Sequence, residues 1–191
     1  MKIVIAGAGE VGTHLAKMLS QENQDIILMD PNEERLKFTN NMEVLAMVGN
    51  PTSLKDLQES GIKDADLFIS VTPEEPTNIT ACMLAHSLGA HKTLARINNY
   101  EYLQPKNIEF FQKLGISSMI YPEMLAAREI VTAVQRPWAR QYWELFGGAL
   151  ILIGVKVRDN APIVNKRLTD LSLDQKLYHI VAIKQIGRAH V

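Results

Sequence analysis

The stretch Lys2-Ile-Val-Ile-Ala-Gly-Ala-Gly-Glu-Val-Gly12 decides the fold, because it joins an apolar strand, a glycine-rich turn and the start of a helical pattern. In the turn Gly7-Ala8-Gly9-Glu10-Val11-Gly12, we expect the first glycine to make the tight bend and the second to let backbone amides approach a pyrophosphate. The third lets the helix pack closely on the strand, with the positive end of its dipole toward the phosphates. The pattern predicts the adenosine-diphosphate half of a dinucleotide site; the alternative is an ordinary glycine-rich turn without a ligand.

A second apolar strand ends at Asp30, where a carboxylate is expected to accept hydrogen bonds from the adenosine ribose. A carboxylate at this position also repels a ribose 2′-phosphate, which favours NAD over NADP. It does not separate NAD(H) from ADP or ATP, because all three share the adenosine ribose and a diphosphate.

Apolar runs and helical patterns alternate along the first part of the chain. Most runs are continuous Val, Ile and Leu, as expected where helices cover both faces of a parallel sheet. Ser53 with Asp56 resembles a capping box, and Gly61, Gly89 and Gly115 stand where helices should stop. This order predicts an α/β domain with a doubly wound parallel sheet of the Rossmann type. The predicted strands are residues 2–6, 25–29, 44–48, 67–71, 93–97 and 118–121.

A further helix is predicted from Pro122 to Gln135, where Pro137 would end it. Its apolar positions cover a wide arc that suits packing on another subunit. They are Met124, Leu125, Ile130, Val131 and Val134.

The pattern changes after Trp138, where strands are predicted at 149–157 and 178–185 around a turn-forming segment at 158–162. We place a boundary near residue 138, with a Rossmann nucleotide-binding domain at 1–137. Residues 138–191 are then the first part of a small α/β C-terminal domain, which we expect to be truncated because so few residues seldom form an independent domain.

The composition argues against nucleic-acid-binding, secreted and membrane-spanning proteins. The chain is 47% hydrophobic, enough for a packed core, and its net charge of −1 gives no electrostatic argument for nucleic acid. Its one cysteine, Cys82, lies among apolar residues and is interpreted as a buried filler in a reducing compartment. No signal-peptide pattern is present, and no apolar run approaches the ~20 residues of a membrane span. We therefore expect a soluble chain that reaches a membrane only through a partner.

No pattern points to catalysis or to a metal ion. None of the five histidines forms a spaced pair with a second histidine or a cysteine. The one nearest the glycine turn, His14, is expected on the first helix and facing solvent. We therefore predict no catalytic residue and no metal ligand.

Polar residues at the carboxyl ends of other predicted strands are the remaining ligand candidates. Asn50 follows the third strand, Thr72 follows the fourth and Arg96 ends the fifth. Thr72 could bind a ribose or phosphate or cap a helix, and Arg96 could neutralise phosphate or form a surface ion pair. For Asn78, a capping or solvent-exposed position competes with ligand contact. Glu10 is either solvated or a contact to ribose.

Together these features resemble a known family. Over residues 1–136 the chain is similar to the regulator-of-potassium-conductance (KTN) domain of TrkA, the cytosolic subunit of Trk potassium uptake systems, in which two such modules are commonly arranged in tandem. Beyond Trp138, Val155-Lys156-Val157 and Ala161-Pro162-Ile163-Val164 resemble the opening of the small domain that follows in this family. The residues that carry the resemblance are Gly7-Ala8-Gly9-Glu10-Val11-Gly12, Asp30, Val48-Gly49-Asn50, Val71-Thr72-Pro73-Glu74-Glu75-Pro76-Thr77-Asn78 and Leu94-Ala95-Arg96-Ile97.

The resemblance implies a non-catalytic nucleotide sensor. NAD(H), ADP or ATP would bind at the switch point of the sheet and change how assembled subunits act on a membrane-embedded potassium channel or transporter subunit. The protein would be cytoplasmic, held at the inner face of the cell membrane by that partner, and would self-associate as a dimer or higher oligomer. The family's nucleotide contacts carry over to Gly7, Ala8, Gly9, Glu10, Val11, Asp30, Asn50, Thr72, Pro73 and Arg96, with Gly12 completing the turn.

Two other functions stay open at this point. One is an NAD-dependent oxidoreductase that lacks its substrate domain, and the other is an assembly module with a vestigial nucleotide site. Asn50 departs from the family's pattern, because members often carry an aspartate or another polar residue at this position.

Overall fold

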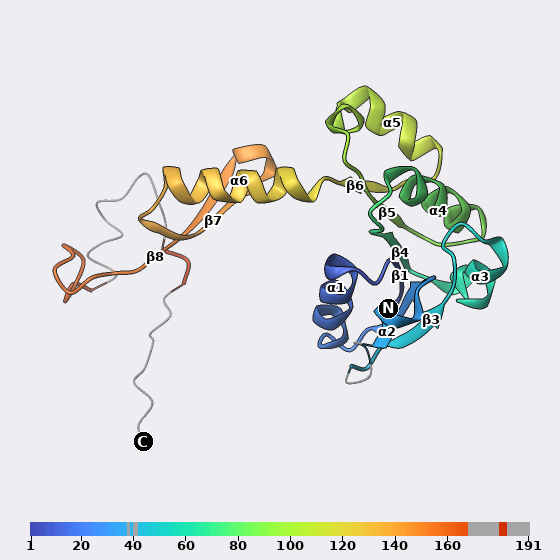
Figure 1. Cartoon of the computed structure of the whole chain (residues 1–191). Coiled ribbons are helices and arrows are strands. Elements are labelled where there is room, and N and C mark those ends of the chain that lie inside the picture. Colours follow the sequence, from blue (N-terminus) through green and yellow to red (C-terminus); the bar gives the residue numbers. More distant parts are fainter. Residues whose placement is uncertain (38, 40–41, 168–179, 183–191) are drawn as a thin grey trace, which may run out of the picture. The chain divides into compact units, whose positions relative to one another are not determined.

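The computed structural model describes residues 1–37, 39, 42–167 and 180–182. The chain divides into two compact units, Met1–Glu129 (the first unit) and Ile130–Val191 (the second unit), which are described separately (Figure 1). The sequence-based boundary near residue 138 stays a prediction. Of the strand predicted at 178–185, all but residues 180–182 lies outside the described residues.

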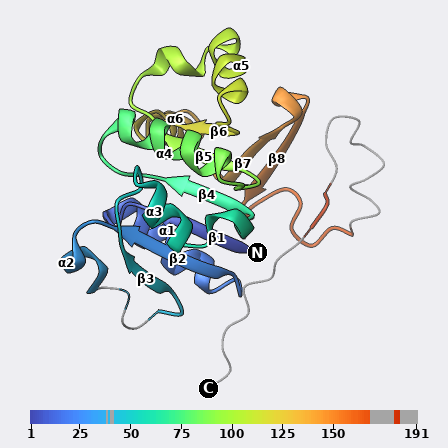
Figure 2. The ribbon, with the colours of Figure 1, turned by 90° about the vertical axis from the view of Figure 1, so that its right-hand side faces the viewer.

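The first unit contains a six-stranded parallel sheet in the order β3-β2-β1-β4-β5-β6 (Figure 2). This order reverses direction at β1, so the sheet is doubly wound and the predicted fold class is confirmed. Each predicted strand is present, with ends within one residue of the prediction. The strands are β1 (Lys2–Ala6), β2 (Asp25–Asp30), β3 (Leu45–Val48), β4 (Leu67–Ser70), β5 (Thr93–Arg96) and β6 (Ser118–Ile120).

Helices cover both faces of this sheet (Figure 1). Successive side chains of a strand point to opposite faces, and those of β1 enter two separate core clusters. Val4 and Ala6 pack with residues of α3, α4 and α5, whereas Ile3 and Ile5 pack with residues of α1 and α2. The covering helices are α1 (Glu10–Ser20), α2 (Glu33–Leu36), α3 (Leu54–Glu59), α4 (Glu75–Ser87) and α5 (Pro105–Lys113), with short 3₁₀ turns η2 (Ile62–Asp64) and η3 (Tyr100–Leu103). Helix α6 (Pro122–Gln135) follows β6 and contributes no residue to either core cluster.

The predicted helix ends are also found. The Ser53 side chain accepts a hydrogen bond from the Asp56 amide at 3.3 Å, as an N-cap residue does. Helices α3, α4 and α5 end within two residues of Gly61, Gly89 and Gly115, respectively.

Cys82 lies on α4 in the core and is fully buried. Burial raises the pKa of its thiol to about 12, so it is uncharged at neutral pH. The interpretation of Cys82 as a buried filler is confirmed.

The second unit contains an antiparallel hairpin of β7 (Ala139–Leu145) and β8 (Leu150–Val155), joined by η4 (Phe146–Gly148). Strand β8 falls within the predicted strand at 149–157. Strand β7 was not predicted, because Arg140, Gln141 and Glu144 interrupt its apolar residues. Such a strand has no continuous apolar run to mark it.

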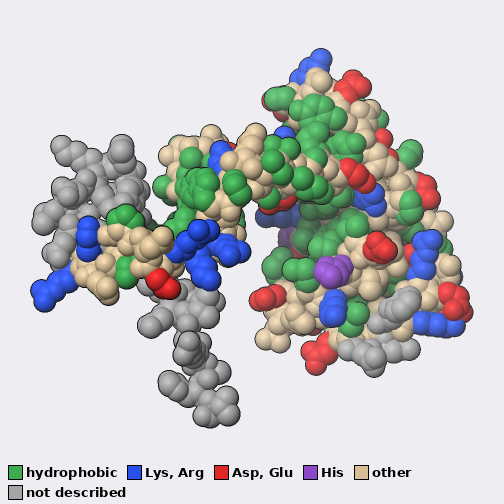
Figure 3. Space-filling model, turned by 60° about the vertical axis from the view of Figure 1, so that its left-hand side comes forward, with side chains coloured by type: hydrophobic (Ala, Val, Ile, Leu, Met, Phe, Trp, Pro, Cys, Tyr) green, Lys and Arg blue, Asp and Glu red, His purple; other side chains and the backbone are tan. Residues whose placement is uncertain are grey.

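Helix α6 begins and ends where predicted, and hydrophobic side chains are exposed along it (Figure 3). Half or more of the surface of each of these side chains is accessible: Leu125, Ile130, Val131 and Val134. None of the helices in the described part of the chain has both the length and the apolarity needed to cross a membrane.

Candidate functional site

The carboxyl ends of β1 to β5 border a cleft of about 1170 Å³. Every predicted ligand residue except Gly12 lines it. The lining residues are Gly7, Ala8, Gly9, Glu10, Val11, Thr13, His14, Lys17, Asp30, Pro31, Arg35, Asn50, Pro51, Val71, Thr72, Pro73, Glu74, Thr77 and Arg96. The topology therefore brings the predicted residues to one edge of the sheet, as expected at a switch point.

The glycine turn has the close packing that its spacing predicts. Gly7 has a φ of +104°, and its N–H donates to the Met29 carbonyl at 2.8 Å. A Cβ on Gly12 would lie 1.8 Å from the Gly7 carbonyl oxygen, so only glycine fits there. Gly12 therefore shapes the turn from behind. A Cβ on Gly9 would meet nothing within 4 Å, which leaves the N-terminal end of α1 open to the cleft.

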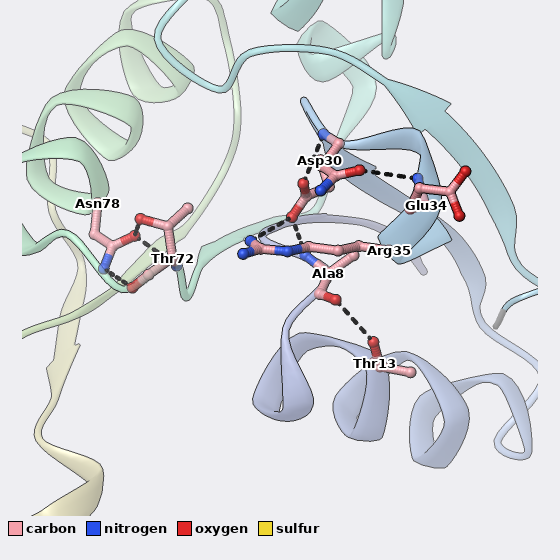
Figure 4. A network of polar contacts seen from close by, with 8 residues as sticks. Ala8, Thr13, Asp30, Glu34, Arg35, Thr72 and Asn78 are labelled. Atoms are coloured by element: carbon pink, nitrogen blue, oxygen red, sulfur yellow. Dashed lines mark hydrogen bonds and ion pairs between the residues drawn. The ribbon is translucent and has the colours of Figure 1, made fainter. Parts of the chain in front are cut away.

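Asp30 is 2% exposed, and backbone amides hold its carboxylate (Figure 4). Its Oδ2 accepts a hydrogen bond from the Ala8 N–H at 2.8 Å, and its Oδ1 accepts one from the Asn32 N–H at 2.8 Å. Asp30 thus ties the end of β2 to the glycine turn, a role that the sequence analysis did not predict. Each carboxylate oxygen can accept a further hydrogen bond, so the ribose contact remains chemically open.

Arg35 was not among the ligand candidates predicted from the sequence. Its Nη1 lies 3.7 Å from Asp30 Oδ2, its side chain is half-exposed, and it lines the cleft. Its place on α2, directly after the acidic strand end, could have identified it. With Lys17 and Arg96 it gives the lining three cationic side chains, which stand against the three carboxylates of Glu10, Asp30 and Glu74.

Asn78 corrects the sequence analysis. It is 1% exposed on α4, so capping, solvent exposure and ligand contact were all wrong interpretations. Its Oδ1 accepts hydrogen bonds from Ser70 Oγ at 2.9 Å, from the Thr72 amide at 2.9 Å and from Thr72 Oγ1 at 2.8 Å. Its Nδ2 donates to the carbonyls of Thr72 at 2.9 Å and Arg96 at 3.0 Å. Asn78 therefore fixes the ends of β4 and β5 to each other. Figure 4 shows its hydrogen bonds with Thr72.

Thr72 is buried, and its hydroxyl has two acceptors in reach, Asn78 Oδ1 at 2.8 Å and the Glu74 carbonyl at 3.4 Å. Its oxygen keeps an acceptor site, so a ligand hydroxyl could still donate to it. Pro73, the next residue, is exposed and also lines the cleft.

Arg96 forms the ion pair that was one of its two predicted roles. Its Nη2 donates to Glu123 Oε1 at 2.8 Å, and Glu123 belongs to the first turn of α6. Arg96 also lines the cleft, so a phosphate contact is compatible with its position.

Asn50 is exposed at the rim next to β3. Its Oδ1 accepts hydrogen bonds from the Thr52 backbone N–H at 2.9 Å and from Thr52 Oγ1 at 2.8 Å. The backbone N–H of Asn50 donates to Asp56 Oδ2 at 2.7 Å. Its side-chain oxygen is therefore occupied, and a ligand would meet its NH₂ group.

Within the described residues, no group of three or more His, Cys, Asp or Glu side chains is placed to hold a metal ion. His14 lies exposed on α1, as predicted, and lines the cleft.

Comparison with known proteins identifies the family. The sequence model of the TrkA-N domain matches residues 3–122, which contain the glycine turn and all five strand ends of the cleft. The chain belongs to the TrkA-N family.

Relatives within the TrkA-N family are potassium uptake proteins. The chain is 34% identical over 189 residues to the Trk system potassium uptake protein TrkA homolog of Methanothermobacter thermautotrophicus, covering 98% of this chain and 84% of that one. It is 32% identical over 191 residues to the TrkA homolog of Archaeoglobus fulgidus, covering 100% of this chain and 43% of that one. The chain thus spans less than half the length of the second relative.

Solved structures share the TrkA-N fold at lower identity. The TrkA-N domain of inner membrane protein ybaL from Escherichia coli has a TM-score of 0.60 at 16% identity, covering 70% of this chain and 96% of that one. GsuK bound to ADP has a TM-score of 0.58 at 18% identity, covering 71% and 35%. The GsuK channel bound to NAD has a TM-score of 0.52 at 18% identity, covering 62% and 21%. At these identities the likeness concerns the fold alone.

Proposed function

We propose that the first unit binds an adenine nucleotide, NAD(H), ADP or ATP, in the cleft and acts as a regulatory domain without catalysis. The observation that carries this proposal is the open N-terminal end of α1 above the glycine turn, with Asp30 tied to the same turn. A helix N-terminus with free amides is suited to a diphosphate.

The strand order supports a direction for the ligand along the cleft. From β2 through β1 to β4 and β5, the ligand would meet Asp30, the glycine turn, Thr72 and Arg96 in that order. The adenosine ribose then belongs at Asp30 and the diphosphate at the turn. The nicotinamide half of NAD, or the last phosphate of ATP, would extend toward β5. GsuK structures with ADP and with NAD support this choice of ligands.

The names of the related proteins suggest the kind of partner on which this chain acts. Because they are Trk system potassium uptake proteins, we propose that the chain is a cytoplasmic subunit that acts on a membrane-embedded potassium channel or transporter subunit. The exposed apolar side chains of α6 provide a surface on which two copies can associate. Nucleotide binding would then shift the assembly between states to the extent that the ligand prefers one of them.

Calorimetric titration of the 191-residue chain with NAD, NADH, ADP and ATP tests the nucleotide site. Gly9→Val should obstruct the phosphates, and Asp30→Ala should weaken every ligand by roughly 1.5–3 kcal/mol. Arg96→Ala should weaken ATP more than NAD. The control is Asp25→Ala, at the exposed start of the same strand as Asp30. Binding that is indifferent to Gly9 and Asp30 would place the nucleotide elsewhere.

Two further measurements test regulation against catalysis. Ile130→Asp and Val134→Asp should dissociate a dimer in analytical ultracentrifugation, whereas Ile130→Leu and Val134→Ile, which keep the surface apolar, should not. Steady oxidation of NADH with a small carbonyl substrate would instead favour the dehydrogenase. The partner itself is tested by nucleotide-dependent potassium flux in vesicles that contain both subunits.

A further inference from the structure

Arg96 and Glu123 connect the cleft to the first turn of α6. Arg96 Nη2 donates to Glu123 Oε1 at 2.8 Å, and both residues belong to the first unit. The Arg96 side chain is 22% exposed and the Glu123 side chain is 55% exposed. The carboxylate thus approaches the guanidinium from the solvent side, where it can be exchanged.

The two ends of Arg96 differ in how firmly they are held. Its backbone carbonyl accepts a hydrogen bond from the buried Asn78 Nδ2 at 3.0 Å, which fixes where the side chain starts. Its Nε is buried and has no hydrogen-bond partner among the described residues. A guanidinium has several N–H donors, so Glu123 leaves part of its capacity unused.

We propose that Glu123 determines ligand specificity by competing with a terminal phosphate for Arg96. The inference rests on the proposed nucleotide site. A diphosphate at the glycine turn lies on β1, and β5 is two strand spacings away, roughly 10 Å. A third phosphate extends in that direction and carries negative charge, whereas the nicotinamide ribose of NAD carries none there. Only the triphosphate then has to displace Glu123.

The displacement is energetically feasible. Exposed ion pairs contribute about 0–1 kcal/mol, so a multiply charged phosphate can replace one carboxylate. Glu123 is in the first turn of α6, where the positive end of the helix dipole continues to stabilise it after release. Glu123 therefore reduces ATP affinity without preventing ATP binding, and it leaves NAD affinity unaffected.

Calorimetry on the full 191-residue chain tests this inference. Glu123→Gln should strengthen ATP binding about two- to fivefold, the equivalent of one exposed ion pair, and leave NAD binding unchanged. Glu129→Gln is the matched control: it makes the same charge change at an exposed position of α6, and Glu129 is in none of the ion pairs found among the described residues. In the double variant Arg96→Gln/Glu123→Gln, the gain for ATP should disappear.

The outcomes separate this inference from the nucleotide site itself. If NAD and ATP bind the wild-type chain but Glu123→Gln leaves their ratio unchanged, or Glu129→Gln reproduces the gain, the competition is refuted and the nucleotide site stands. If neither nucleotide binds the wild-type chain, both proposals fail.

A second measurement needs no variant. Hydrogen exchange of the backbone amides in the first turn of α6 should quicken with saturating ATP and not with NAD, because only ATP releases Glu123. Equal exchange with both nucleotides would contradict the competition even if Glu123→Gln did not fold.

Discussion

The two ends of the cleft use charge differently. At one end, Asp30 is 2% exposed and two backbone amides hold its carboxylate at 2.8 Å. At the other end, the charge of Arg96 is held by one carboxylate, that of Glu123, which is 55% exposed. The Asp30 carboxylate therefore holds the glycine turn in place, whereas the Arg96 guanidinium can exchange its partner. A site built this way can fix one half of a nucleotide and discriminate at the other half.

Both ends of the cleft rest on buried, closely packed residues. Gly12 packs against the Gly7 carbonyl below the Asp30 end, and Asn78 joins β4 to β5 below the Arg96 end. The comparison therefore predicts large losses of stability from substitutions in this layer and small ones from the Arg96–Glu123 pair.

The largest effect is expected for Gly12→Val. A Cβ at this position would lie 1.8 Å from a backbone oxygen, so β1 and α1 must separate to admit it. The free energy of unfolding, measured by urea denaturation, should fall by more than about 4 kcal/mol. Gly9→Ala is the control, because its Cβ would point into open space; as an N-cap change it should cost no more than about 1 kcal/mol. Similar losses in both variants would mean that the turn is not tightly packed.

Asn78→Ala should have the next largest effect. It would leave the Thr72 amide and the Arg96 carbonyl without their partner in a buried place, which should cost about 3–4 kcal/mol. Thr80→Ala, at an exposed position on the same helix, should change stability little. A loss for Asn78→Ala no greater than that for Thr80→Ala would show that the Arg96 end lacks a rigid base.

A smaller loss is expected for Asp30→Asn. An amide has one acceptor oxygen, so its NH₂ group must face one of the two backbone N–H groups that the carboxylate now accepts from. Stability should fall by about 1.5–3 kcal/mol. Asp25→Asn, at the exposed start of the same strand, is the control and should be close to neutral. A neutral result for Asp30→Asn would mean that its carboxylate does not hold the turn.

These residues also show what the sequence could predict. Glycine spacing reports backbone geometry directly, so the turn at Gly7 and the packing of Gly12 followed from the pattern. The strand ends at Asp30, Thr72 and Arg96 followed from parallel topology, which brings them to one edge.

The role of Asn78 could not be read in the same way. Its partners include the carbonyl of Arg96, which is distant in the chain, and local patterns do not report such contacts. An asparagine in a first helical turn is usually a cap or solvated, so the local sequence favoured an exposed position for Asn78. The second role of Asp30 was missed for a similar reason, because its amide partner Ala8 lies on another element.

The smallest effect is expected for the Arg96–Glu123 pair, and it tests the comparison most directly. In a double-mutant cycle of Arg96→Gln, Glu123→Gln and the double variant, the coupling energy from urea denaturation should be about 0.2–1 kcal/mol. Because Glu123 is 55% exposed, water replaces most of what the pair provides, and added salt should reduce the coupling further. A coupling above about 2 kcal/mol, insensitive to salt, would make this pair as fixed as the Asp30 carboxylate. Arg96 could not then be released to a phosphate, and the contrast between the two ends of the cleft would not hold.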